Sequence, residues 1–223
     1  MARDFDGTDD RIDWPSIFTT SGQAKTVCLW TYLDNATGFA YFWNTHTAPD
    51  TGLGTLFFLT TTAGQLQVSK VGSVTGFNAS VGSTLITGVW THILFHDDGS
   101  TTGANIKIYK NGVEVSYASP GNVTTENVAS GSWSLGGRKT DDTRNINGRI
   151  AEAAAWDREL SKKEIAILGK GFSPLFLQNG LRYYTPVMGN SAQEQDFISG
   201  QSGVLDGTTK IRHPRIIYPR NFR

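Results

Sequence analysis

Three carboxylates, Glu152, Asp157 and Glu159, stand close together in the segment NINGRIAEAAAWDREL, residues 145–160. Two carboxyl groups that flank a substrate can act as general acid and general base. The same segment is rich in alanine, which has the highest helix propensity of all residues. The segment is therefore either an acid/base site or a structural element without chemistry, and the surrounding elements have to decide between the two.

The histidines offer a second kind of chemistry, metal ligation. His92 and His96 lie in WTHILFH, which reads as a strand and would place both rings on one face. Together with Asp97 or Asp98 they could ligate a metal ion, but a half-exposed polar role is more common for alternating histidines on a strand. The sequence also has no Gly-Lys-Ser/Thr phosphate loop and no G-x-S-x-G serine. We predict no catalytic residue, no metal site and no cofactor.

The acidic run near the N-terminus contains Asp4, Asp6, Asp9 and Asp10. Such a cluster of oxygens could hold a hard cation such as Ca²⁺. Asp-Gly and Thr-Asp-Asp are also favoured in turns, because short polar side chains bond their own backbone there. We interpret the run as a turn.

The composition excludes several classes of partner. The 223 residues include 20 basic and 20 acidic side chains, so nothing in the overall charge indicates nucleic-acid or membrane binding. No apolar segment has the length of a membrane span or the form of a secretion signal, which predicts synthesis and folding in the cytoplasm. The single cysteine, Cys28, excludes an internal disulfide, and its neighbours in TVCLW place it in the core.

Short apolar runs separated by turn residues predict an all-β protein. The runs are TVCLWTYLD, GFAYFWNT, TLFFLTT, QLQVSKV, WTHILFH, NIKIYKNGVEVSYA and SWSLGG. Asn111-Gly112 is the strongest hairpin signal, because a type I′ turn needs positive φ at both central residues. Many short strands with frequent turns are typical of a two-sheet antiparallel sandwich or jelly roll.

One short helix is expected near residues 161–168. Ser161 is a good N-cap, and Glu164 three residues later completes a capping box. Gly169 or Gly171 would end this helix.

This helix start argues against a helix in the preceding segment. We therefore expect residues 149–156 to form a strand, followed by a turn at 157–158. Small side chains suit a crowded contact between sheets. Strand alternation then puts Glu152 on the face opposite Ala151.

The order of motifs resembles the laminin-G-like, concanavalin A-like jelly roll. These motifs are FDGTDDRIDW, TVCLWTYL, GVWTHILFHDDG, IKIYKNGVEV, SWSLGGR and NGRIAEAAAWDRELSKKEIAIL. The resemblance covers about residues 5–168 and implies two curved antiparallel sheets. We expect residues 1–172 to form the jelly roll and residues 173–223 to form an irregular C-terminal extension, which packs on the sandwich or docks a partner.

The resemblance also brings enzymes and calcium into consideration. Its laminarinase-type branch carries catalytic carboxylates in an E-x-D-x-x-E-like pattern. Glu194 and Asp196 match the first two positions, but Ser199 stands at the third, so the sequence disfavours the alternative of a glycoside hydrolase. Relatives often hold calcium with an aspartate where this chain has Ala151, and a methyl group cannot ligate a cation.

Glycan binding needs aromatic rings to stack on sugars and polar groups for the hydroxyls. We assign Trp30, Trp90 and Trp156 to the core. The candidate ligand-binding residues are Tyr41, Trp43, His46, Arg138, Asp141 and Asp142.

Two functions remain from the sequence. The first is a non-catalytic phage virion protein, for example a head-decoration, fibre or tail-surface module. Its partners would be other virion proteins, copies of itself or host-surface glycans, and its location the virion. The second is a lectin-like module that acts alone. The residues expected to dock a virion partner are those of the basic tail, namely Arg212, Arg215, Tyr218 and Arg220.

Overall fold

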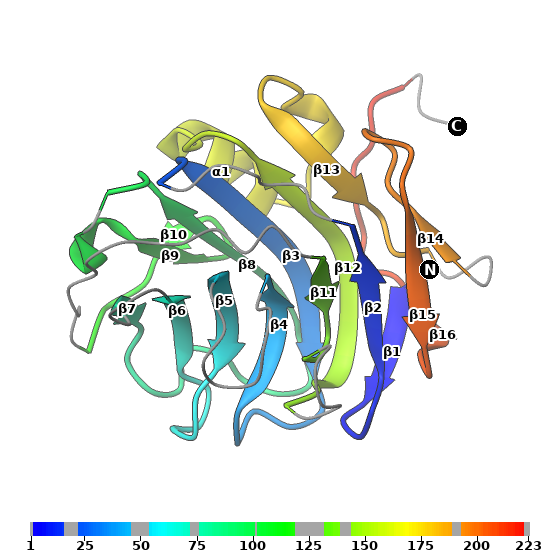
Figure 1. Cartoon of the computed structure of the whole chain (residues 1–223), viewed down its shortest axis with the longest axis horizontal. Helices are drawn as coiled ribbons and strands as arrows, with labels where there is room; N and C mark the ends of the chain where they lie inside the picture. Colours follow the sequence, from blue (N-terminus) through cyan, green and yellow to red (C-terminus); the bar gives the residue numbers. More distant parts are fainter. Residues whose placement is uncertain are drawn as a thin grey trace.

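The residues that the structure describes fold into two antiparallel sheets of eight strands each, stacked face to face (Figure 1). The computed structural model describes residues 2–15, 22–45, 54–71, 76–100, 102–118, 132–138, 144–188 and 193–220. The predicted all-β, two-sheet antiparallel jelly-roll sandwich is confirmed. Within these residues no helix is both long and apolar enough to cross a membrane.

Sheet A forms one layer of the sandwich. Its strands are β1 (Ala2–Asp6), β3 (Lys25–Leu33), β8 (Trp90–Asp97), β9 (Lys107–Lys110), β10 (Val113–Glu114), β12 (Asn147–Trp156), β13 (Leu181–Thr185) and β16 (Thr209–Ile211). Their order is β10-β9-β8-β3-β12-β1-β16, and β13 also pairs with β12. β12 thus has β1 beside its first half and β13 beside its second half.

Sheet B forms the other layer. Its strands are β2 (Arg11–Trp14), β4 (Ala40–Asn44), β5 (Gly54–Leu59), β6 (Leu66–Val71), β7 (Gly76–Ala79), β11 (Trp133–Leu135), β14 (Gln193–Gln195) and β15 (Ser202–Asp206). They follow the order β14-β15-β2-β11-β4-β5-β6-β7. Two short 3₁₀ helices, η1 (Gly103–Asn105) and η2 (Pro174–Phe176), lie in the connections.

Aromatic side chains fill the core between the sheets. Trp14 and Trp133 stack with their ring centres 4.7 Å apart, and the Tyr183 ring meets that of Trp133 edge-on at 4.4 Å. Trp43 lies 6.2 Å from Trp133 in the same cluster. All four side chains are fully buried, so they contribute to the hydrophobic stabilisation of the fold.

Both local turn and cap predictions are confirmed. Asn111 and Gly112 have φ values of 49° and 80°, as a type I′ turn between β9 and β10 requires. Helix α1 (Lys162–Gly169) begins after Ser161, whose hydroxyl accepts from the Glu164 N–H while the Glu164 carboxylate accepts from the Ser161 N–H. α1 covers part of the outer face of sheet A, where its apolar side chains pack on β8 and β12.

The segment 145–160 is largely a strand, as predicted, but the expected orientation of Glu152 is wrong. Strand pairing between β12 and β3 shifts between Ala151 and Ala154, and Glu152 has a φ of 55°. This bulge reverses the alternation, so that the Glu152 carboxylate reaches Tyr184 on the outer side of sheet A. The rule that successive side chains alternate between the two faces of a strand fails wherever a bulge inserts an extra residue.

The C-terminal extension is more regular than its sequence indicates. It supplies β13 and β16 to sheet A and β14 and β15 to sheet B. These strands are three to five residues long, which is too short for a clear alternation pattern. β13, β15 and β16 become regular because they pair with the earlier strands β12, β2 and β1, and β14 pairs in turn with β15.

Candidate functional site

A cross-strand row of side chains crosses the outer face of sheet B. In order across the sheet it consists of Gln193, Val204, Asp13, Ser134, Asn44, Leu56, Ser69 and Phe77. Its centre is polar and rigid, because Asn44 donates to the Ser134 hydroxyl at 2.7 Å and to the Gly137 carbonyl at 2.8 Å. Asn44 and Ser134 are each only 1% exposed, so this polar centre braces the face from within and leaves ligand contacts to more exposed residues.

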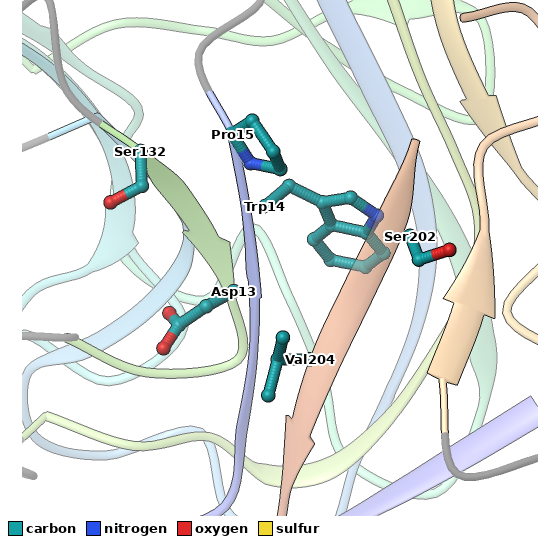
Figure 2. A pocket seen from close by; sticks show the side chains of 6 residues that line it. All are labelled: Asp13, Trp14, Pro15, Ser132, Ser202 and Val204. Atoms are coloured by element: carbon teal, nitrogen blue, oxygen red, sulfur yellow. The ribbon is translucent and has the colours of Figure 1, made fainter. Parts of the chain in front are cut away.

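An open pocket of about 390 Å³ lies along this face, where β2 is flanked by β11 and β15. Its lining consists of Asp13, Trp14, Pro15, Ser132, Ser202 and Val204. In the view of Figure 2, Asp13 and Ser132 lie on one side of β2, and Trp14, Ser202 and Val204 lie on the other. The volume falls within the range of small-molecule sites.

The polar groups of the pocket are held by neighbouring side chains. The Asp13 carboxylate accepts from Arg11 Nε at 3.1 Å, and Arg11 also contacts Asp206 at 2.9 Å. The Ser202 hydroxyl accepts from the Gln195 side chain at 2.9 Å and still has its own proton to donate. The pocket therefore offers both an acceptor and a donor at fixed positions.

The apolar side of the pocket rests on the core. Val204 is 59% exposed, whereas Trp14 is only 1% exposed and stacks on Trp133 beneath the surface. A Cβ atom on Gly203 would lie 2.2 Å from the Trp14 ring, so only glycine lets β15 pass this close. The shape of the pocket thus depends on tight packing under β15.

The described ligand-binding candidates from the sequence do not line this pocket. Trp43 is 1% exposed in the core, so its ring cannot stack on a ligand, and that assignment is wrong. Tyr41 does lie on the outer face of sheet B, but it is buried beneath Arg144, whose Nη1 donates to the Tyr41 hydroxyl at 2.8 Å. Arg138 is buried as well. His46, Asp141 and Asp142 lie outside the described residues.

The lining residues could be found from the sequence only in part. Ile12 and Trp14 point into the core, so alternation alone would have placed Asp13 on the outer face. Ser202 and Val204 carry no such signal, because they reach the pocket only through the pairing of β15 with β2, strands about 190 residues apart.

The carboxylates that resembled a hydrolase pattern have structural partners. Glu194 forms a buried ion pair with Arg3, with 2.7 Å between its Oε1 and Arg3 Nε. Asp196 accepts from the backbone N–H groups of Tyr184 and Ile198 at 3.0 and 2.9 Å. Both carboxylates are therefore occupied in holding the C-terminal strands.

The N-terminal aspartates form a turn, as interpreted. The carboxylates of Asp6, Asp9 and Asp10 lie within 4.8 Å of one another. Asp6 accepts from the Thr8 N–H, and Asp10 accepts from the Asp6 N–H. Burial and the neighbouring carboxylates raise the pKa of Asp10. In the part of the chain that the structure describes, His92 and His96 belong to no group of three metal-ligating side chains.

The four tail residues predicted to dock a partner differ in exposure and in their contacts. Arg212, Arg215 and Arg220 are exposed, and their role in docking a partner stays a prediction. The Tyr218 hydroxyl donates to Glu152 Oε1 at 2.6 Å. Tyr218 thus anchors the tail to its own sandwich, and its role in docking a partner also stays a prediction.

The comparisons with known proteins agree with this fold. The search of the curated proteins finds no match. Among solved structures, a putative carbohydrate binding protein from Bacteroides ovatus is 16% identical with a TM-score of 0.68, and the match covers 93% of this chain and 58% of that protein. The chain therefore spans little more than half the length of that relative.

Two further neighbours are domains of larger enzymes. Domain 4 of AbnA, an extracellular arabinanase from Geobacillus stearothermophilus solved in complex with arabinotriose, is 22% identical over 75% of this chain and 76% of that chain, with a TM-score of 0.56. The carbohydrate-binding module CBM40 of a Ruminococcus gnavus sialidase, bound to α2,3-sialyllactose, is 10% identical over 76% of this chain and 98% of its own, also with a TM-score of 0.56. At these identities the likeness shows the fold.

The family model of the concanavalin A-like lectin/glucanases superfamily matches residues 6–166. This range runs from the end of β1 through β12 and into helix α1, so it covers strands of both sheets, whereas β13, β14, β15 and β16 follow it. Because the match covers more than half of the 223 residues, the chain belongs to the concanavalin A-like lectin/glucanase superfamily.

Proposed function

We propose that this chain is a non-catalytic carbohydrate-binding domain whose ligand site is the pocket between β2, β11 and β15. The observation that carries the proposal is the mixed lining of the pocket, which combines the exposed Val204 side chain with the Ser202 hydroxyl and the Asp13 carboxylate. A sugar ring presents apolar C–H groups on its faces and hydroxyls at its edge, so it complements such a lining.

The carboxylates around the pocket support binding rather than cleavage. Glycoside hydrolysis uses two carboxyl groups that flank the scissile bond. Of the six residues that line the pocket, only Asp13 is acidic. The similar structures support the same proposal, since the Bacteroides ovatus neighbour is described as a putative carbohydrate binding protein and the arabinanase domain was solved with arabinotriose.

A glycan array with the purified chain tests the proposal, with Asp13→Asn as the chemical variant. We expect saturable binding to at least one class of oligosaccharide. The variant should bind about tenfold more weakly, because a neutral amide accepts a hydroxyl hydrogen bond less strongly than a carboxylate.

A steric variant provides a matched control. Val204 is 59% exposed, so a substitution there changes the pocket with little effect on the core. Val204→Gln should project into the pocket and reduce binding, whereas Val204→Thr keeps the shape and should bind like the wild type. An array without any saturable binding, or equal binding by Val204→Gln, would contradict the proposal.

The setting in a phage virion stays a prediction from the sequence, and a virion protein made in the host cytoplasm could use such a pocket to hold host glycans. Mass spectrometry of purified virions tests it. Stoichiometric peptides of this chain would support the virion setting, and their absence from the particles would rule it out.

A further inference from the structure

Four rings form a two-by-two block on the outer face of sheet A, where β3 pairs with β8. Trp30 lies opposite His92, and Tyr32 lies opposite Trp90. The ring centres are 5.5 Å apart in the first pair and 5.9 Å apart in the second. We define the rings of Trp30, Tyr32, Trp90 and His92 as the ring block.

The ring block is a surface feature, which corrects the prediction from the sequence that Trp30 and Trp90 are core residues. Trp30, Tyr32 and Trp90 are partly exposed, whereas His92 is buried between its neighbours. The apolar cluster under α1 includes Cys28 on β3 and Leu94 on β8, but none of the four rings. Helix α1 therefore covers one part of this face, and the ring block lies beyond it.

Hydrogen-bonding groups lie beside the rings. Arg149 places its guanidinium carbon 4.3 Å from the centre of the Tyr32 ring, and its Nε donates to Asp4 Oδ1 at 3.2 Å. Its Nη2 lies 3.9 Å from Asp34 Oδ2. Asp4, Arg149, Tyr32 and Trp90 thus form one cross-strand row over β1, β12, β3 and β8.

The charges beside the ring block select the kind of ligand. Asp4 and Asp34 contribute two negative charges, and Arg149 contributes one positive charge. Burial lowers the pKa of His92 to about 3, so this ring is neutral at physiological pH. The surroundings of the rings therefore carry one excess negative charge, which disfavours an anionic sugar and suits hydroxyl groups that donate to carboxylates.

The area of the ring block also limits what it can bind. Three partly exposed aromatic side chains present roughly 250 Å² or less. A stable dimer buries about 800 Å² on each partner. The rings alone are too small for a protein interface of this kind, and their area fits a few sugar units.

We propose that the ring block is a second ligand site, which binds a neutral polysaccharide chain by stacking on Trp30 and Trp90. The hydroxyls of the chain donate to Asp4 and Asp34. This inference rests on the proposed glycan-binding function and adds a site on the opposite outer face of the sandwich from the pocket at Asp13. A domain with both sites holds two glycan segments at once.

Tryptophan oxidation tests the site in the wild-type chain. Of the six tryptophans, Trp14, Trp43, Trp133 and Trp156 are fully buried. N-bromosuccinimide should therefore oxidise two indoles rapidly in the native protein. A polysaccharide bound at the ring block should slow this oxidation at least fivefold, and unchanged oxidation with bound polysaccharide would overturn the proposal.

Affinity electrophoresis in gels that contain β-glucan, xylan, arabinan or mannan separates the two sites. We expect at least one gel to retard the wild type and the pocket variant Val204→Gln, and to retard the Trp30→Ala/Trp90→Ala variant at least tenfold less. The Lys163→Ala variant, altered at an exposed residue of α1, should migrate like the wild type.

The other outcomes overturn the proposal in distinguishable ways. Retardation that the pocket variant loses and the ring-block variant keeps would leave the proposed function and remove the second site. No retardation of the wild type in any of the four gels would overturn the second site, while the glycan array decides separately on the proposed function. A dimer in sedimentation that the ring-block variant dissociates would assign the rings to a second copy of the chain instead.

Discussion

At the residue scale, Glu152 is the clearest case of a carboxylate whose role only the structure reveals. It is 1% exposed and accepts from the hydroxyls of Tyr184 and Tyr218, while His213 Nε2 lies 3.1 Å from Oε1. Burial and the nearby Glu152 carboxylate raise the pKa of both tyrosines, so their hydroxyls stay protonated and donate. A buried carboxylate with this set of partners anchors structure, and here it anchors the C-terminal tail to the bulge of β12.

Removal of one donor should loosen this anchor. Tyr218→Phe deletes a hydrogen bond to a charged group, which costs about 1.5–3 kcal/mol of unfolding free energy. Urea unfolding at pH 7 measures the loss, and limited proteolysis should cleave the tail of the variant faster.

The exposed Arg215 offers the control for this experiment. Arg215→Ala should change the unfolding free energy by less than about 0.5 kcal/mol. Equal stability of Tyr218→Phe and wild type would show that the tail is not held by this contact.

At the element scale, short sequence signals predict those features that depend on adjacent residues only. The Asn111-Gly112 turn and the capping box of Ser161 and Glu164 need only a few adjacent residues, and both are found in the structure. The bulge at Glu152 escaped prediction because it arises where β12 changes its neighbour from β1 to β13. No pattern within a single strand encodes such a change of partner.

The capped start of α1 predicts a pH effect. The Arg158 guanidinium, together with bonds from Ser161, lowers the pKa of Glu164 from its ordinary 4.5 to about 2. A lowered pKa means that the charged form stabilises the fold above pH 4.5, and that this contribution is lost as the pH falls toward 2. We expect Glu164→Gln, which keeps an N3 acceptor for the cap, to destabilise by roughly 0.5–1 kcal/mol at pH 7.

The difference in stability between the wild type and Glu164→Gln should disappear in acid. Thermal unfolding of wild type and Glu164→Gln between pH 7 and pH 2 should give curves that converge near the lower limit. A gap that stays constant down to pH 2 would show that the charge of Glu164 does not contribute.

At the scale of the whole molecule, the fold was predictable and the site largely was not. The recurrence of short strands and the order of motifs were sufficient for the two-sheet jelly roll, but a period of two shows only that residues alternate between faces. It does not show which face another element covers, and for this reason the sequence alone wrongly predicts Trp30 and Trp90 in the core and Trp43 in a binding site. The candidate pocket joins β2, β11 and β15, which lie at three distant places in the sequence.

The proposed function of this superfamily member is sugar binding in the pocket on sheet B. The most direct measurement is an NMR titration of the labelled chain with an oligosaccharide from the strongest array class, followed through the Val204 methyl and Trp14 indole signals. We expect saturable shifts of both signals, and the same titration of Val204→Gln should leave the Trp14 signal in place. Saturable shifts confined to residues away from the pocket, or no shifts at concentrations that saturate the array, would contradict the proposed function.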